Sequence, residues 1–277
     1  MNDVVEAPPL NYFGGKWKSA PWYIENMPPH KTFVDLFGGG CNIILRKPRS
    51  KYEIYNDLDG EVINFFRIIQ NPDTCQKLFR LLKRIPYARE AFYDAYNPTD
   101  DTIQRAANLA IKSHMSIHVS AMWKGKGSNF HSTTRSSRFH ATTWIKFQRT
   151  IPQVRQRLQG VVIENKDAIK LIPQFDYPDT LFFADPPYMP ETRKGASYGC
   201  EMTPEQHAAL LDALIQAQGN AMVCGYDNQL YREKLAGWKL LTRKGQAMMS
   251  GHKGRIECLW IKMPMEEKTG GVQQSLL

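Results

Sequence analysis

Apolar and polar positions alternate along the chain in blocks that predict strands and helices in turn. Short apolar runs predict strands at 31–37, 52–56, 161–164, 181–184, 221–226 and 256–261, with a further strand region at 238–249. Helices are expected at 41–45, 58–70, 75–85, 89–96, 102–115, 144–158 and from 203 onward. This order is typical of an α/β fold with a mostly parallel sheet.

The alternation breaks between residues 71 and 150. Helical stretches there lead into a Gly/Ser/Thr/His-rich segment, 116–143, that lacks clear periodicity. We therefore expect an inserted, mostly helical domain at 71–150. It would interrupt a catalytic domain made of 1–70 and 151–263, and a mobile tail would follow at 264–277.

Length and composition indicate a globular protein, with 277 residues of which 42% are hydrophobic. The absence of a long apolar run and of a signal-peptide layout predicts a cytoplasmic protein without membrane contact. Five scattered cysteines favour neither disulfides nor zinc and are expected to be buried. His114 and His118 lack a third ligand nearby, so we expect surface or base-edge groups rather than a metal site.

Positive charge is concentrated in one window of the chain. The net charge is +9, and 102–163 holds ten Lys and Arg residues but no Asp or Glu. A segment of this length that carries only positive charge is typical of proteins that bind a polyanion such as nucleic acid. A basic surface that is merely solvated would have the same composition.

The strand at 31–37 runs through Gly38, Gly39 and Gly40 into a helix, the order found in nucleotide-binding turns. The spacing is not G-x-G-x-x-G, which favours a smaller adenosine ligand over a dinucleotide. Asp57 ends the next strand and can accept from ribose hydroxyls or cap the helix that starts at Leu58. Asp167 can likewise accept an adenine amino group or cap a helix.

A second glycine turn lies near the N-terminus, where Gly14 and Gly15 stand between aromatic residues and Lys16. Glycines permit close approach of a ligand, the aromatic rings can flank a flat group, and Lys16 can meet a carboxylate. A tight turn with a surface lysine would look the same.

The strand at 181–184 is followed by Asp185, Pro186, Pro187 and Tyr188. In an open α/β sheet this position, outside the carboxyl end of a strand, is where ligands bind. Asp185 and a carbonyl held by the prolines can accept both hydrogens of an exocyclic amine, and Tyr188 offers a face for a base taken out of a duplex. The alternative is a rigid turn with Asp185 capping a backbone amide and Tyr188 in the core.

Cations interleaved with aromatic and amide side chains predict the nucleic-acid contacts, because such mixtures hold phosphates while a loop probes a groove. The predicted DNA-binding residues are Lys112, Trp123, Lys124, Lys126, Asn129, Arg135, Arg138, Arg193 and Lys194.

The ordered motifs Gly-Gly-Lys, Phe-Val-Asp-Leu-Phe-Gly-Gly-Gly, Asn-Asp-Leu and Asp-Pro-Pro-Tyr resemble those of the Dam family (D12 class) of DNA adenine-N6 methyltransferases. The resemblance spans roughly 8–262. It implies S-adenosylmethionine as methyl donor and a Rossmann-like class I methyltransferase sheet with an antiparallel final strand. The residues it assigns to the cofactor are Tyr12, Lys16, Asp35, Phe37, Gly38, Gly39, Gly40, Asp57 and Asp185, to which Asp167 is added from its place in the sheet.

The expected activity is methyl transfer from S-adenosylmethionine to N6 of a flipped adenine in double-stranded DNA, without a metal, by a monomer or weak dimer. The insert differs from the recognition loop of GATC-methylating family members, so the target sequence stays open. Both a sequence-specific enzyme of a restriction-modification system and a phage enzyme with relaxed sequence recognition are possible. RNA adenine, cytosine N4 and a non-catalytic DNA-binding protein are the alternatives. Cytosine C5 chemistry is disfavoured because none of the five cysteines follows a proline.

Overall fold

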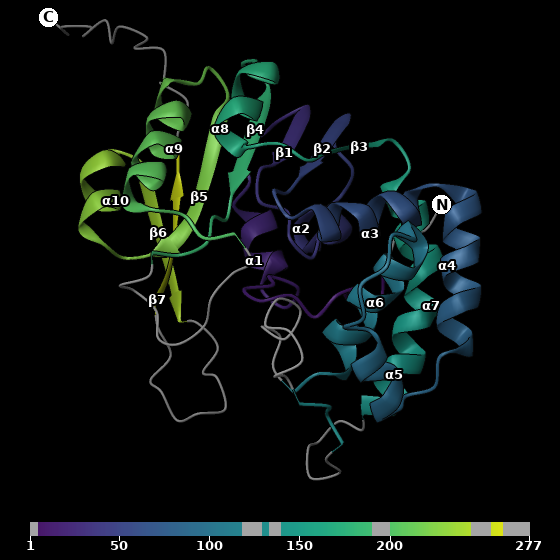
Figure 1. Cartoon of the computed structure of the whole chain (residues 1–277). Helices are drawn as coiled ribbons and strands as arrows, with labels where there is room; N and C mark the ends of the chain where they lie inside the picture. The colour runs from purple at the N-terminus through teal and green to yellow at the C-terminus, as the bar shows by residue number, and fades with distance from the viewer. Residues whose placement is uncertain (1–4, 118–128, 133–139, 190–199, 245–255, 263–277) are drawn as a thin grey trace, which may run out of the picture.

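The computed structural model describes residues 5–117, 129–132, 140–189, 200–244 and 256–262 (Figure 1). Within these ranges the centre is a 7-stranded sheet of order β3-β2-β1-β4-β5-β7-β6. The strands are β1 (Thr32–Asp35), β2 (Tyr52–Asn56), β3 (Val161–Glu164), β4 (Thr180–Ala184), β5 (Asn220–Tyr226), β6 (Lys239–Lys244) and β7 (Ile256–Ile261). The first five run parallel, whereas β7 is antiparallel to both β5 and β6. This confirms the predicted class I methyltransferase sheet with its antiparallel final strand.

Helices cover both faces of the sheet (Figure 1). They are α1 (Ala20–Glu25), α2 (Asn42–Arg46), α3 (Gly60–Gln70), α4 (Pro72–Arg84), α5 (Arg89–Asp94), α6 (Thr102–Met115), α7 (His140–Leu158), α8 (Ala168–Leu171), the short 3-10 helix η3 (Ile172–Gln174), α9 (Pro204–Gln216) and α10 (Gln229–Lys234). None of the described helices is long and apolar enough to cross a membrane.

Most predicted elements lie within two residues of their expected bounds. The strands β2, β3 and β7 and the helix α6 match their predicted ranges. The helix α7 begins at His140, four residues before the predicted start at 144, because the apolar positions used for the prediction begin only at Trp144, which is buried. The predicted tail, 264–277, lies outside the described residues.

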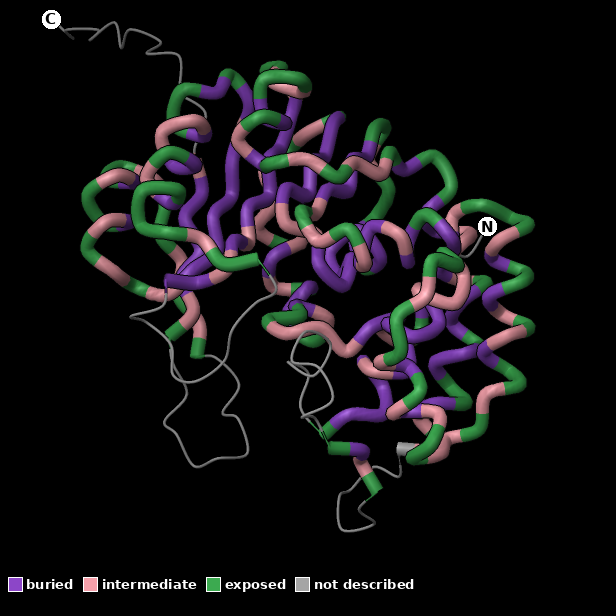
Figure 2. The backbone as a smooth tube through the Cα atoms, in the orientation of Figure 1, coloured by how far each residue is buried: buried purple, intermediate pink, exposed green. Residues whose placement is uncertain are grey.

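Alternate residues of the central strands pack into two separate cores, which is the two-sided burial expected of a parallel sheet. In β4, Leu181 and Phe183 join the core beneath α1, α3, α6 and α7, whereas Phe182 joins the core beneath α8, α9 and α10. The central strands β1, β4 and β5 are buried along nearly all of their length, whereas the edge strands β3 and β6 and the outer helix faces carry exposed residues (Figure 2).

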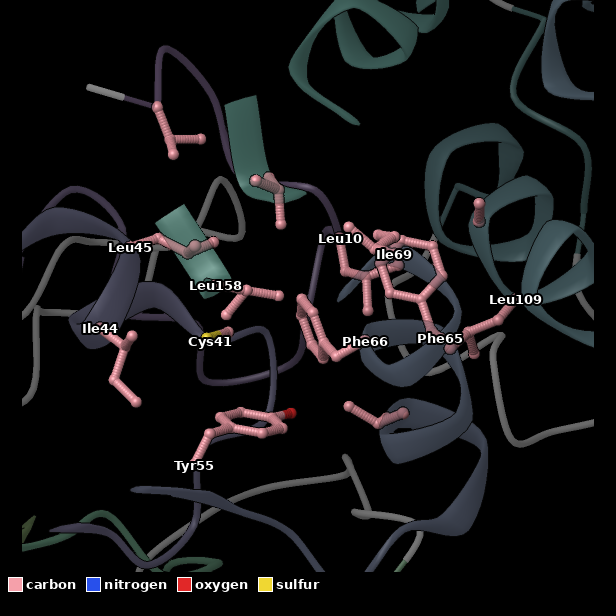
Figure 3. Close-up of a cluster of buried hydrophobic side chains, with 14 of the residues drawn as sticks. Leu10, Cys41, Ile44, Leu45, Tyr55, Phe65, Phe66, Ile69, Leu109 and Leu158 are labelled. Carbon is pink, nitrogen blue, oxygen red and sulfur yellow. The ribbon is translucent and has the colours of Figure 1, made fainter. Parts of the chain in front are cut away.

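The helices of the predicted insert continue the first core. Helix α3 contacts α4, α6 and α7. Phe66 of α3 packs against Tyr55 of β2 with ring centroids 5.0 Å apart, and Phe65 points toward Leu109 of α6 (Figure 3). Helix α7 runs through residue 150, the predicted end of the insert. The division into 71–150 and a catalytic remainder therefore stays a proposal.

A buried cluster of charges joins β2 to α7. Glu53 accepts from Arg157 at 2.6 and 2.9 Å and from Lys47 Nζ at 2.7 Å, and the three side chains are at most 3% exposed. Burial raises the pKa of Glu53, but the hydrogen bonds and charges of Arg157 and Lys47 outweigh it and hold this pKa below its ordinary value. The cluster ties a strand of the sheet to a helix 104 residues away in sequence.

Replacing Glu53 by Ala should lower the free energy of unfolding by about 3–5 kcal/mol, because two buried cations lose their partner. Urea denaturation at pH 7 measures this, with exposed Glu25→Ala as the control. Since the pKa of folded Glu53 is depressed, its stabilisation is present above about pH 4.3 and is lost as pH falls through the folded value. A Glu53→Ala effect equal to that of the control would contradict the role of the cluster.

Candidate active site

The carboxyl ends of β1, β2, β3 and β4 meet at one edge of the sheet around an open cavity of about 1100 Å3, counting the solvent at its mouth. The ten residues predicted to bind a cofactor all line it: Tyr12, Lys16, Asp35, Phe37, Gly38, Gly39, Gly40, Asp57, Asp167 and Asp185. Parallel strand order explains the convergence, since each of these four strands ends at the same edge. The structure brings the residues together, whereas their roles toward a ligand stay predictions.

The glycine turn after β1 leaves no room for side chains. A Cβ on Gly38 would lie 2.2 Å from the ring of Tyr55, and Gly39 has a φ of +46° with Tyr12 only 2.6 Å from a Cβ placed there. The Tyr55 hydroxyl donates to the Gly39 carbonyl at 2.6 Å. The turn is thus pressed between two aromatic rings, with its backbone forming one wall of the cavity.

Asp57 is bonded to the glycine turn and does not cap a helix. Its two oxygens accept from the backbone N–H groups of Gly39 and Asp59, each at 2.8 Å, while Asp59 is the N-cap of α3. Burial raises the pKa of Asp57 to about 6, although the N–H groups of Asp59 and Gly39 lower it. Because each carboxylate oxygen has two lone pairs, Asp57 can still accept two further hydrogen bonds. The capping alternative for Asp57 is therefore wrong.

Asp167 does cap a helix, as the second sequence alternative had it. Its Oδ1 accepts from the N–H groups of Ile169 and Lys170, and the side chain is exposed at the cavity wall. The cap uses one oxygen of the carboxylate. A role toward a ligand is compatible with this position and stays a prediction.

Asn56, which the sequence analysis did not single out, holds the strand ends together. Its amide nitrogen donates to the carbonyls of Leu36 and Lys166, and its oxygen accepts from the Lys166 N–H at 3.0 Å. One buried side chain at the end of β2 thus links the segments that follow β1 and β3. A polar residue directly before Asp57, at a strand end, was the available signal.

Asp185 directly follows β4 and forms an ion pair with Lys16, with Asp185 Oδ2 and Lys16 Nζ 2.6 Å apart. Burial raises the pKa of Asp185, and the charge of Lys16 opposes this rise. The sequence predicted that Lys16 meets a carboxylate, and the structure identifies that carboxylate as Asp185. Lys16 is only 6% exposed, so the surface alternative is wrong.

Tyr188 is 8% exposed and stands at the edge of the site. Its ring packs edge-on against Tyr226 of β5, with centroids 4.7 Å apart, and Lys16 Nζ lies 5.1 Å from the ring centroid. Pro187 lines the cavity, whereas Pro186 and Tyr188 are buried beside it. Tyr188 belongs to the buried core cluster, as the alternative interpretation of the sequence had it. Its stacking role stays a prediction.

Three buried oxygens at the cavity have no hydrogen-bond partner among the described residues: Asp35 Oδ1, Asn42 Oδ1 and Asp185 Oδ1. Burial raises the pKa of Asp35 well above its ordinary value. Buried acceptors of this kind favour a ligand that brings N–H donors or a positive charge. Asn42 was missed in the sequence, where it lies within an apolar helical run.

Of the predicted DNA contacts, Trp123, Lys124, Lys126, Arg135, Arg138, Arg193 and Lys194 lie outside the described residues. Lys112 of α6 is half-buried over the Tyr96 ring, and burial lowers its pKa. The Asn129 side chain is exposed, and its carbonyl accepts from the Ile117 N–H at 3.0 Å. The DNA-binding roles of both stay predictions.

Two expectations about single residues are wrong. His114 is 5% exposed, stacks on Phe147 and contacts the Pro9 carbonyl at 3.0 Å, so it is a core residue rather than a surface or base-edge group. Cys200 is exposed at the cavity rather than buried, unlike the other four cysteines. Spacing alone did not show which face of α6 packs against α7. Within the described ranges, no three His, Cys, Asp or Glu side chains are grouped to hold a metal.

Comparison with known proteins identifies the family of this chain. A model of the D12 class N6 adenine-specific DNA methyltransferases matches residues 12–249. The chain is 40% identical over 63 residues to the modification methylase StsI of Streptococcus sanguinis, covering 22% of this chain and 10% of that protein. It is 26% identical over 198 residues to the modification methylase LlaI of Lactococcus lactis subsp. lactis, covering 66% of this chain and 30% of the relative. The chain thus spans less than a third of either relative.

Among solved structures, a protein provisionally assigned as an rRNA methylase of Clostridium thermocellum aligns over 88% of this chain and 95% of its own. The identity is 10% and the TM-score 0.37, which is too low to bear on fold or function.

The packing of the glycine turn predicts that Gly38→Ala destabilises the protein by about 1–3 kcal/mol, as overpacking does, because the fully buried Tyr55 ring has no room to retreat. Urea denaturation measures the change. Gly60→Ala is the matched control, since a Cβ there meets only one atom, at 3.9 Å, and lies in the first turn of α3. The control should be neutral or slightly stabilising, and equal effects of the two substitutions would contradict the close packing.

Proposed function

Since the chain belongs to the D12 class of N6 adenine-specific DNA methyltransferases, we propose that it transfers a methyl group from S-adenosylmethionine to N6 of adenine in DNA. The observation that carries the proposal is the arrangement of one cavity. The glycine turn and Asp57 lie in its wall, and Asp185 lies in the same wall with one buried oxygen unpaired among the described residues. A site for a nucleoside is thus continuous with an acceptor for an amine.

The cavity residues fit the parts of S-adenosylmethionine. Asp57 has lone pairs left for the two ribose hydroxyls, and the exposed oxygen of Asp167 can accept an adenine amino group. Asp35 and Asn42 present buried acceptors, as an ammonium group requires. When bound, the sulfonium of this cofactor supplies an electrophilic methyl group. The glycine turn lets the backbone come close to the ligand.

The protein's own contribution to the chemistry is to hold and desolvate the target amine. Asp185, whose rise in pKa on burial is opposed by Lys16, accepts one N–H of the amine, and the Pro186 carbonyl accepts the other. Both acceptors favour a lone pair directed at the methyl group. As the nitrogen forms its new bond it loses a proton, and Asp185, which holds the amine in this proposal, can accept it. Orientation of two reactants in this way supplies about 7–11 kcal/mol in model systems.

The substrate is proposed to be double-stranded DNA, with the adenine flipped out and stacked on Tyr188. The basic window of 102–163 supports contact with phosphates, and we assign target recognition to 71–150. Both curated relatives are modification methylases, which favours a site-specific enzyme. A cytoplasmic location and a monomer or weak dimer stay predictions.

Asp185→Ala should abolish methyl transfer while leaving DNA affinity unchanged, because it removes the acceptor of the amine but no DNA-facing cation. The measurement is incorporation of tritiated methyl groups into unmethylated DNA, followed by nucleoside analysis. Asp179→Ala is the control, since this half-exposed carboxylate lies at the other end of β4 and pairs with Lys31. Retained transfer by Asp185→Ala would disprove the assignment. If the label appears in N4-methylcytosine or in RNA, methyl transfer to an exocyclic amine is retained as the reaction, but the proposed substrate is wrong.

Cofactor binding should weaken as pH falls through about 6, the pKa of Asp57, because only the carboxylate can accept from both ribose hydroxyls. The dissociation constant of S-adenosylhomocysteine, measured by calorimetry, should rise by up to about tenfold per pH unit below that value. The ligand's own α-amino and carboxyl groups titrate near 8 and 3.5, outside this range. Asp57→Asn should bind weakly at every pH, and a pH step that persists in this variant would exclude Asp57 as its source.

A further inference from the structure

Lys16 is a buried cation whose charge is directed at another residue of the site. Its Nζ lies 2.6 Å from Asp185 Oδ2 and donates to the Gly14 carbonyl at 3.0 Å. The two charged side chains are 7% and 16% exposed. A charge-assisted contact of this length in a site with little water is strong and directional.

The backbone of Lys16 is held as firmly as its side chain. Its carbonyl accepts from the N–H groups of Ser19 and Ala20, at 2.9 and 2.7 Å, and from the Ser19 hydroxyl at 3.1 Å. These bonds join Lys16 to the first turn of α1, which packs in the core through Tyr23. The ammonium therefore reaches Asp185 from a rigid support rather than from a free loop.

We propose that Lys16 is a positioning residue of the methyl-transfer site, which holds Asp185 by Oδ2 so that Oδ1 is left to accept the target amine. Lys16 then acts through Asp185 and does not bind the carboxylate of the cofactor. The inference rests on the proposed function for its meaning in catalysis. The evidence for the two roles of the carboxylate is the 2.6 Å contact at Oδ2 and the lack of a hydrogen-bond partner for Oδ1 among the described residues.

The same ammonium lies beside the ring on which the base is proposed to stack. Lys16 Nζ is 5.1 Å from the centroid of Tyr188, a distance at which a cation is attracted to an aromatic face. Tyr226 meets the same ring edge-on at 4.7 Å. Lys16 thus ties together the acceptor of the amine and the stacking surface.

The surroundings of Asp185 make its ionisation depend on Lys16. Burial raises the pKa of Asp185, and the charge and hydrogen bond of Lys16 lower it. Glu257 of β7 raises this pKa, and the Tyr188 hydroxyl lowers it. Arg243 is itself paired with Glu257, 2.6 Å away. The titratable and charged groups that face Asp185 are Lys16, Asp35, Tyr23, Tyr188, Cys224, Tyr231 and Glu257. Lys16 is the cation among these groups. Without it, the neighbouring negative charges would raise the pKa of Asp185 further.

The test replaces Lys16 by Met, which keeps the aliphatic stem and removes the charge, and by Arg, which keeps the charge. Lys18→Met is the matched control, because Lys18 is two residues away and exposed. Three quantities are measured for each variant: the pH profile of single-turnover methyl transfer, the affinity for S-adenosylhomocysteine, and the titration of Asp185 by NMR with 13C-carboxyl aspartate. The Asp185 signal is identified by its loss in Asp185→Asn.

Lys16→Met should move the acid limb of the rate profile, and the NMR titration of Asp185, upward by about 1–3 pH units. At a fixed pH below the new limb, the rate should fall about tenfold for every pH unit by which the limb has moved. Affinity for S-adenosylhomocysteine should stay unchanged, Lys16→Arg should restore most of the profile, and Lys18→Met should match the wild type.

A Lys16→Met variant that loses affinity for S-adenosylhomocysteine while both titrations stay in place would overturn the inference and return Lys16 to the cofactor. The NMR titration needs no catalysis, so it decides the pairing even if the wild-type protein methylates no DNA. In that case the proposed function fails while the role of Lys16 toward Asp185 is still measured. If Lys16→Met does not fold, the wild-type protein still tests the pairing: an Asp185 carboxyl signal that never responds to the ionisation of Lys16 at high pH would equally overturn the inference.

Discussion

The ion pair between Asp185 and Lys16 is the constraint on which the site depends. A carboxylate at the end of a buried strand loses hydration, and burial alone would favour its neutral form. The neutral acid could no longer accept from an amine with both oxygens. Lys16 offsets this cost at 2.6 Å, and the fold around it supports that contact: the Gly14 carbonyl holds the ammonium, and α1 holds its backbone.

The molecule contains a second buried ion cluster that has a different task. Glu53, Arg157 and Lys47 are buried and bonded to one another, Lys47 also donates to the Pro48 carbonyl and the Ser50 hydroxyl, and the cluster joins β2 to α7. At the cavity, by contrast, the acceptors Asp35 Oδ1, Asn42 Oδ1 and Asp185 Oδ1 find no partner among the described residues. Full satisfaction suits a structural tie, whereas unmet acceptors at an open cavity suit a ligand. This contrast separates scaffold from site without reference to motifs.

Local geometry decided between alternatives that the sequence left open. A capping aspartate and a ligand-binding aspartate occupy the same position after a strand. For Asp57 the choice depended on Asp59, whose side chain takes the cap and leaves Asp57 to the Gly39 N–H. For Asp167 the cap is present, since no neighbouring acid competes for it. Asn56 escaped notice because its role is to join three segments that are distant in sequence.

The sequence by itself determined the order of the strands along the chain, most of the helices but not α1 or α10, the glycine turn, and the edge where Asp35, Asp57, Asp167 and Asp185 meet. These depend on periodicity and on parallel strand order, which are local or topological properties. Only the tertiary structure decided that Lys16 pairs with Asp185, that His114 is buried against Phe147, and that α7 shares a core with α3. Those outcomes depend on distances between side chains from remote segments, and burial then sets their charge and their partners.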